Sequence, residues 1–195
     1  MFRTLIRKRQ PQETMLIFAM IGMSVAFLFL TVSYLLRKDT AGWIPFTLPK
    51  AFAFSTFFML ISSYTLYVAN VSFKKEDFFT YRYMLGVTFL LGLVFIFCQV
   101  IGWRQLEAKG LFFVKGSISV GFLYILSGLH ILHLLGGLIA LGILLRQAIR
   151  KIDYVDAFVY SVNPPNQRRL YLSTLYWHFL DVVWLYLYVF FYVQH

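Results

Sequence analysis

Five long apolar stretches dominate this chain of 195 residues. Each is free of Lys, Arg and Glu, and each exceeds the ~20 residues that an α-helix needs to cross the hydrocarbon core of a bilayer. None alternates apolar and polar residues as the strands of a membrane β-barrel do. Backbone groups in lipid must be hydrogen-bonded within the chain, so we expect an all-α bundle of five membrane-spanning helices. The stretches are Met15–Leu36, Ala51–Phe73, Tyr83–Trp103, Gly116–Leu145 and Leu170–His195, in one domain covering residues 1–195.

The composition favours a membrane protein over a soluble one. Hydrophobic residues make up 60% of the chain and charged residues only 13%, which is too apolar for a soluble domain of this size. The net charge of +10 comes from Lys and Arg between the apolar stretches. We therefore interpret it as a topology signal and a contact for lipid headgroups, not as a nucleic-acid site.

The distribution of basic residues predicts the orientation in the membrane. Alternate connections carry twelve Lys and Arg on one side and six on the other. Because cytoplasmic loops are enriched in these residues, we expect a cytoplasmic N-terminus and an external C-terminus. The twelve basic residues on the cytoplasmic side are Arg3, Arg7, Lys8, Arg9, Lys74, Lys75, Arg82, Arg146, Arg150, Lys151, Arg168 and Arg169.

The longest connection between the apolar stretches contains two prolines within 163–166. We expect them to break any helix there.

Asp181 is the only acidic residue inside any of the five stretches. A charged carboxylate at mid-membrane costs roughly 2.5–3.5 kcal/mol on insertion scales. His178 precedes it by three residues, so the two side chains share one helix face. The pair is either a proton relay or, as we favour, a hydrogen-bonded pair that fixes helix packing.

Two further histidines, His130 and His133, are also three residues apart. Membrane histidines can ligate haem or copper, but a bis-histidine haem usually takes its ligands from different helices. We interpret these residues, with Gln99, as polar groups that pair between helices, while His178 keeps haem ligation formally open.

A cluster of basic residues follows the fourth apolar stretch. Arg146 and Lys151 are placed to bind the phosphate of a phospholipid, with Arg150 between them. They equally serve as topology markers, and the two roles are compatible.

These residues resemble those of subunit III of haem-copper terminal oxidases, in its short five-helix form. Tyr176–Trp184, which reads YWHFLDVVW, is the most specific element, and Ser127–His133 resembles another helix of the family. Leu85–Gly92, followed by Gln99, resembles a third, and Arg146-Gln147 matches an Arg-Gln pair at a helix end. The resemblance covers nearly the whole chain.

The resemblance implies an accessory subunit without catalytic residues or a redox cofactor of its own. Haem and copper would belong to subunits I and II of a proton-translocating oxidase complex. This chain would pack on subunit I, bind structural phospholipids through Arg146, and support proton uptake and the stability of the oxygen-reducing centre. Further expected partners are cytochrome c as electron donor, a small subunit IV and a respiratory supercomplex.

The sequence also departs from the family pattern. Gly22 stands where the family usually has a membrane glutamate, and Gly102 where it favours another. A quinol oxidase or nitric oxide reductase subunit III is the alternative within the superfamily. A stand-alone haem-binding protein or proton-coupled carrier is the alternative from another class.

Overall fold

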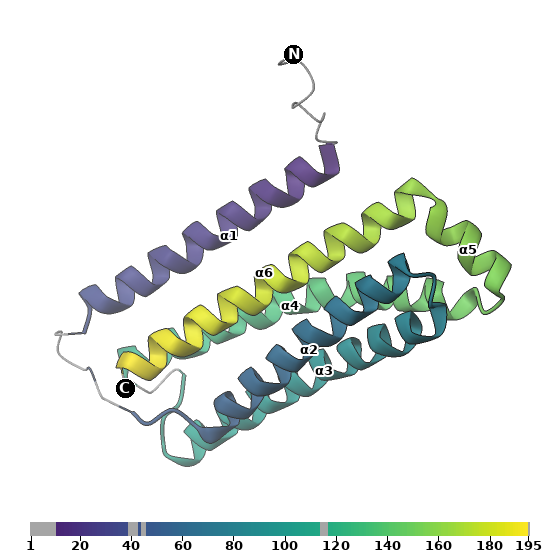
Figure 1. Ribbon diagram of the computed structural model, residues 1–195. Helices are drawn as coiled ribbons and strands as arrows, with labels where there is room; N and C mark the ends of the chain where they lie inside the picture. Colours follow the sequence, from purple (N-terminus) through teal and green to yellow (C-terminus); the bar gives the residue numbers. More distant parts are fainter. Residues whose placement is uncertain (1–10, 39–42, 44–45, 114–116, 195) are drawn as a thin grey trace.

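The computed structural model describes residues 11–38, 43, 46–113 and 117–194. Within these ranges the chain forms six α-helices and no β-strand (Figure 1). Five of the helices are long and apolar enough to cross a membrane, in agreement with the all-α prediction. They are α1 (Pro11–Leu36), α2 (Lys50–Lys74), α3 (Phe78–Ala108), α4 (Ile118–Arg150) and α6 (Pro164–Gln194), with the short α5 (Tyr154–Val162) between the last two.

The long helices extend beyond the apolar stretches at one or both ends, and side-chain caps mark where α3 and α4 begin. α3 begins at Phe78, where the Asp77 carboxylate accepts a hydrogen bond from the Thr80 backbone N–H at 3.1 Å. α4 begins in the same way, with the Ser117 hydroxyl accepting from the Val120 backbone N–H at 3.4 Å.

Helix α5 was not predicted from the sequence. It lies in the connection between α4 and α6, across one end of the bundle (Figure 1). The helix interruption expected at the prolines is present, since α5 ends at Val162 and the backbone of Asn163 is extended. Pro164 then opens α6, because proline at a helix start loses no hydrogen bond.

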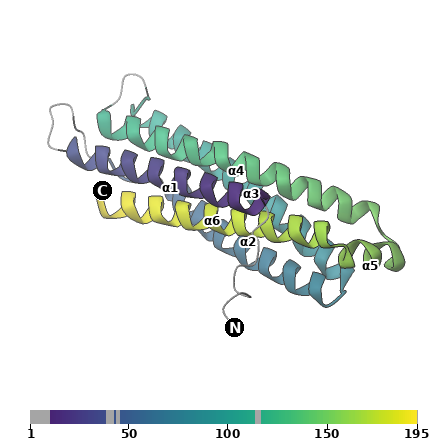
Figure 2. The ribbon, with the colours of Figure 1, turned by 90° about the horizontal axis from the view of Figure 1, so that it is seen from above.

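The long helices run alternately up and down along a common direction (Figures 1 and 2). α2 and α3 form an antiparallel pair, and α6 packs against α1, α2 and α4. One end of the bundle therefore holds α5, the end of α2 and α4 and the start of α3 and α6; we call it the α5 end.

Helix α1 is anchored mainly near its C-terminal end. Tyr34 is fully buried there and makes edge-on contacts with four aromatic rings, whereas only 11% of the most apolar part of α1 is buried. The rings are those of Trp43, Phe122, Phe190 and Phe191. The rest of α1 presents apolar side chains outward, as a lipid-facing helix does.

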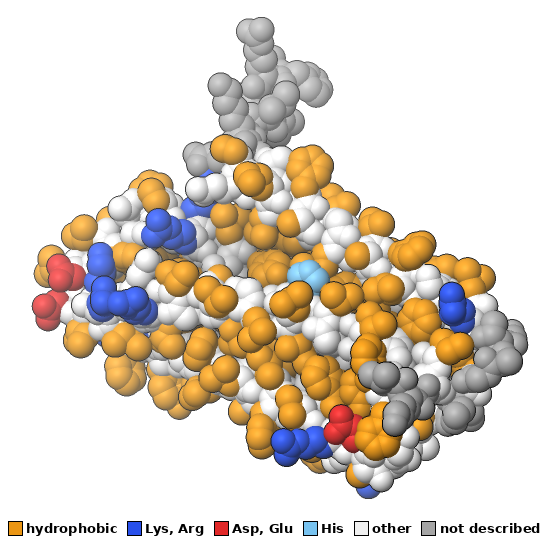
Figure 3. All heavy atoms as spheres, turned by 180° about the vertical axis from the view of Figure 1, so that it is seen from behind, with side chains coloured by type: hydrophobic (Ala, Val, Ile, Leu, Met, Phe, Trp, Pro, Cys, Tyr) orange, Lys and Arg blue, Asp and Glu red, His pale blue; other side chains and the backbone are white. Residues whose placement is uncertain are grey.

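On the face seen in Figure 3, charged side chains gather toward the two ends of the bundle and hydrophobic side chains cover the middle. Arg168 pairs with Glu13 at 3.8 Å at the α5 end, and Lys38 donates to Gln194 at 2.9 Å at the opposite end. An apolar band between polar ends fits a protein that crosses the bilayer. Arg3, Arg7, Lys8 and Arg9, which contribute to the predicted orientation, lie outside the described residues.

Candidate functional site

Polar side chains form a seam between α2 and α6 in the middle of the bundle. Four side-chain hydrogen bonds cross this contact, all between groups that are buried or partly buried, and two of them come from tryptophan N–H groups. They join Asn70 Nδ2 to Thr174 Oγ1 at 2.8 Å, His178 Nδ1 to Ser63 Oγ at 2.8 Å, Trp177 Nε1 to Ser62 Oγ at 3.2 Å, and Trp184 Nε1 to Thr56 Oγ1 at 2.9 Å.

His178 and Asp181 lie together on α6, as their spacing predicted. His178 Nδ1 is 3.6 Å from Asp181 Oδ2, too far for a good hydrogen bond, and its close contact is with Ser63 of α2. Asp181 is buried, and neither carboxylate oxygen has a hydrogen-bond partner among the described residues. The His178 side chain, by contrast, is 37% exposed.

His130 of α4 is fully buried between two aromatic rings. Its ring centroid lies 5.7 Å from that of Phe95 on α3 and 5.2 Å from that of Trp184 on α6. Neither ring nitrogen has a hydrogen-bond partner within the described part of the chain. These contacts with α3 and α6 are typical of a residue that packs helices together.

His133 has a local partner of its own. Its Nδ1 donates to the Leu129 carbonyl oxygen at 2.7 Å, one turn earlier in α4, and its ring lies 6.0 Å from that of Phe27 on α1. Tyr176 of α6 donates to the His133 carbonyl oxygen at 3.2 Å. His133 therefore lies where α1 and α6 meet α4, and the residues that it contacts differ from those that contact His130.

Gln99 belongs to the same buried layer. Its Nε2 donates to Ser55 Oγ on α2 at 2.9 Å, and the residue is fully buried. The Oε1 atom has no partner among the residues described. Of the two polar atoms of the Gln99 amide, only the nitrogen therefore makes the expected hydrogen bond to another helix.

Two glycines allow close contacts between helices. A Cβ atom at Gly92 would lie 2.8 Å from Trp177 Cη2 and 2.9 Å from Leu138 Cδ2. Gly136 is not such a position, since the nearest atom to a Cβ there is 3.9 Å away. The tight position on α4 is Gly137, which faces Trp177 and Leu180.

Gly22, where the family resemblance leads one to expect glutamate, is exposed on α1. A Cβ atom there would meet no other atom within 4 Å. The structure therefore has space for a side chain at this position, and packing does not require glycine.

The basic cluster at the α5 end is divided by the structure. Arg146 and Arg150 are exposed on α4, whereas the Lys151 ammonium lies 4.6 Å from the centre of the Tyr160 ring. Arg82 of α3, which lies 69 residues away in sequence, donates to the Lys151 carbonyl oxygen at 2.9 Å. Local spacing had no signal for this contact, which holds the end of α4 against the start of α3.

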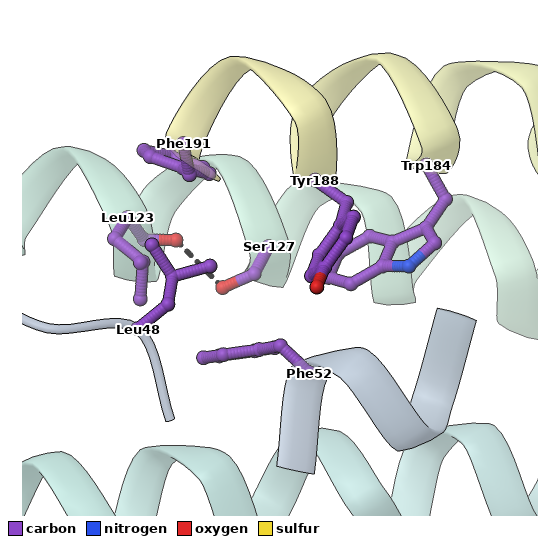
Figure 4. Close-up of a pocket in the computed structure, with 7 residues that line it drawn as sticks. All are labelled: Leu48, Phe52, Leu123, Ser127, Trp184, Tyr188 and Phe191. Carbon is purple, nitrogen blue, oxygen red and sulfur yellow. Dashed lines mark hydrogen bonds between the residues drawn. The ribbon is translucent and has the colours of Figure 1, made fainter. Parts of the chain in front are cut away.

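An apolar pocket opens near the opposite end of the bundle, between the start of α2, the start of α4 and the C-terminal half of α6 (Figure 4). Its polar side chains are Ser127, Tyr188 and Trp184, and the Trp184 Nε1 donates to Thr56 Oγ1. The Ser127 hydroxyl accepts from Trp103 Nε1 at 3.0 Å and donates to the Leu123 carbonyl oxygen at 2.6 Å. The lining thus lacks a titratable acid–base pair. It consists of Leu48, Phe52, Leu123, Ser127, Trp184, Tyr188 and Phe191.

No three His, Cys, Asp or Glu side chains among the described residues gather closely enough to hold a metal ion. The polar groups of the seam instead contact other helices of the same chain. The arrangement joins helices to one another at mid-bundle depth, and its hydrogen bonds are of the kind that holds membrane helices together.

Comparison with known proteins agrees with this arrangement. A family model described as "Cytochrome c oxidase subunit III" matches residues 40–195. The chain is 30% identical over 179 residues to "Cytochrome c oxidase subunit 3" of Bacillus sp. (strain PS3), covering 89% of this chain and 81% of that protein.

Two other relatives carry quinol oxidase names. "Cytochrome bo(3) ubiquinol oxidase subunit 3" of Buchnera aphidicola is 30% identical over 143 residues, covering 71% of this chain and 66% of that one. "Probable quinol oxidase subunit 3" of Staphylococcus saprophyticus is 32% identical over 133 residues, covering 68% and 61%. From the family match and these relatives, the chain belongs to the cytochrome c oxidase subunit III family and is a multi-pass membrane subunit of a haem-copper oxidase complex.

Proposed function

We propose that this chain is an accessory, non-catalytic subunit of a cytochrome c oxidase in a bacterial inner membrane. The observation that carries the proposal is the polar seam, whose hydrogen bonds join α2 to α6, together with the bond from Gln99 to Ser55 that joins α3 to α2. In this role the chain packs on subunit I, which holds the oxygen-reducing haem and copper, while subunit II accepts electrons. It supports proton uptake and protects the centre during turnover.

Removal of the subunit tests this role. Complex purified from a strain lacking this chain should keep its haem absorbance but lose activity faster during sustained oxygen consumption. The same strain carrying the wild-type gene on a plasmid is the control. Loss of haem absorbance in proportion to the loss of this chain would contradict the proposal.

The electron donor has a second candidate, because two of the relatives are named quinol oxidase subunits. We favour cytochrome c since the match to the Bacillus protein covers most of both chains. Oxygen consumption by the purified complex with reduced cytochrome c, compared with a quinol, separates the two. Turnover with quinol alone would favour the second candidate.

We further propose that the α5 end faces the cytoplasm. The described Lys and Arg are more numerous at this end, where Arg146, Lys151 and Arg168 lie, and the positive-inside rule then places the C-terminus outside. A cysteine-labelling reagent that cannot cross the membrane should react with Lys38→Cys in intact cells and not with Arg150→Cys. The reverse pattern would invert the topology.

Phospholipid binding at the basic cluster remains part of the proposed role. Arg146 is exposed and has no partner among the described side chains, so its guanidinium is free for a bidentate contact with a phosphate. Lys151, which lies against Tyr160, would make the weaker contact. A well-resolved map of the complex without lipid density within hydrogen-bonding reach of Arg146 would refute this contact. A small subunit IV and a respiratory supercomplex remain expected partners.

A further inference from the structure

His178 places a polar group on the outside of the bundle at mid-membrane depth. It lies near the middle of the 31-residue α6, with Nδ1 held by Ser63 and more than a third of its side chain exposed. The second ring nitrogen, Nε2, has no partner among the residues that the structure describes. In lipid hydrocarbon an unpaired N–H or ring nitrogen loses the hydrogen bonds that water would provide.

The surface around His178 is defined by two neighbouring helices. Val182 and Leu185 follow His178 along the same side of α6 and are exposed, and Tyr67 continues the row that Ser63 begins on α2. We call these residues, with His178, the α2/α6 face. The α1 side of the face is marked by Tyr186, whose hydroxyl bonds to Thr31 Oγ1 at 2.8 Å.

We infer that the α2/α6 face docks a transmembrane helix of another subunit of the oxidase, which presents a hydrogen-bonding side chain to His178. Lipid tails offer no such group, and phospholipid headgroups lie at the bilayer surfaces, not at the depth of His178. Asp181 lies beside the imidazole, with Oδ2 3.6 Å from Nδ1, but its oxygens are buried and do not reach the surface of the face. A different polypeptide of the complex fits this face better than a second copy of this chain, because the chain belongs to a family of oxidase subunits.

This inference rests on the proposed function and is tested in the intact complex. A photo-crosslinking amino acid is placed at Val182, which is 65% exposed, and as a matched control at Leu132 of α4, which is 62% exposed. The two positions lie at a similar depth, counted from the helix ends at the α5 end. Irradiated membranes should yield several-fold more adduct with another polypeptide of the complex from Val182 than from Leu132.

Three results would overturn the inference in distinguishable ways. If the chain co-purifies with the haem-containing complex but Val182 forms adducts only with lipid, the docking face is wrong and the accessory role stands. Equal capture of the same partner from both positions also refutes a specific face. If the chain does not co-purify at all, the proposed function and the inference fail together.

The hydrogen bond itself is tested by two substitutions at one position. His178→Leu removes the polar group. We expect the amount of this variant chain that stays in the complex after a detergent wash to fall by roughly three- to tenfold, which corresponds to the free energy of one interhelical hydrogen bond. His178→Gln keeps a donor and an acceptor and should recover part of the retention. Wild-type retention of His178→Leu would contradict the contact.

Discussion

Replacing Gly92 by alanine tests how tightly α3, α4 and α6 meet. The added methyl carbon would lie 2.8 Å from Trp177 Cη2 and 2.9 Å from Leu138 Cδ2, both closer than carbon atoms approach without displacement. The Leu138 methyl group can rotate away. Trp177 cannot move easily, because its ring is buried and its Nε1 bonds to Ser62.

The magnitude follows from two opposing terms. Overpacking a core position costs about 1–3 kcal/mol, and alanine in place of glycine within a helix contributes about 0.5–1 kcal/mol of stability. We expect Gly92→Ala to lower the free energy of unfolding by up to about 2.5 kcal/mol after both terms are counted. Gly86→Ala on the same helix meets nothing closer than 3.9 Å and should be neutral or stabilising.

The assay is an SDS titration of the purified chain in detergent micelles, followed by circular dichroism. Trp177→Phe removes the ring atoms that meet the added methyl group, so Gly92→Ala should cost less in that background. A double-mutant cycle then isolates the contact between the two positions. If Gly92→Ala unfolds at the same SDS fraction as Gly86→Ala, the close approach of α3 and α6 is refuted.

Three further predictions concern polar groups. Asp181→Ala should reduce the amount of assembled complex more than the turnover of the complex that remains, measured by subunit ratios and oxygen uptake; normal assembly with abolished turnover would contradict this. Arg82→Gln should speed hydrogen exchange at the end of α4 more than Arg150→Gln, because Arg82 donates to two carbonyl oxygens there and Arg150 makes no such bond to a described residue. Hydrogen bonds from Thr80 lower the pKa of Asp77 below its usual 3.8. The stabilising effect of the Asp77 cap on α3 should therefore be present above pH 4 and be lost as the pH falls through the lowered pKa, which hydrogen exchange of the first turn of α3 measures. Asp77→Asn does not titrate and should lack this pH dependence.

Hydropathy and length were enough to predict the five long helices, because a backbone in lipid has few alternatives. They could not predict α5, whose nine residues include Asp156 and lie beyond the apolar stretches. The helix ends also differ from the edges of those stretches. α6 begins at Pro164, within the segment expected to break a helix, because proline ends one helix and opens the next.

Local spacing predicted only part of the candidate site. It brought His178 and Asp181 together because both lie on one helix face. It could not identify Ser63, the residue that actually bonds to His178, because the two are 115 residues apart in sequence. Arg82 was likewise counted only as a topology signal, since its contact with the end of α4 depends on how α3 and α4 pack.

The four hydrogen bonds between α2 and α6 explain how these helices find one alignment. Hydrophobic burial does little to align two helices in lipid, since the tails are as apolar as the side chains, so a shift by one turn costs little through apolar contact alone. Along α6 the bonded positions rise from Thr174 to Trp184, while their partners on α2 fall from Asn70 to Thr56, as antiparallel helices require. A shift of one turn, about 5.4 Å, would break all four bonds at once. The polar residues of the α2–α6 contact therefore determine which apolar residues meet, and through them the position of His178 on the outer face.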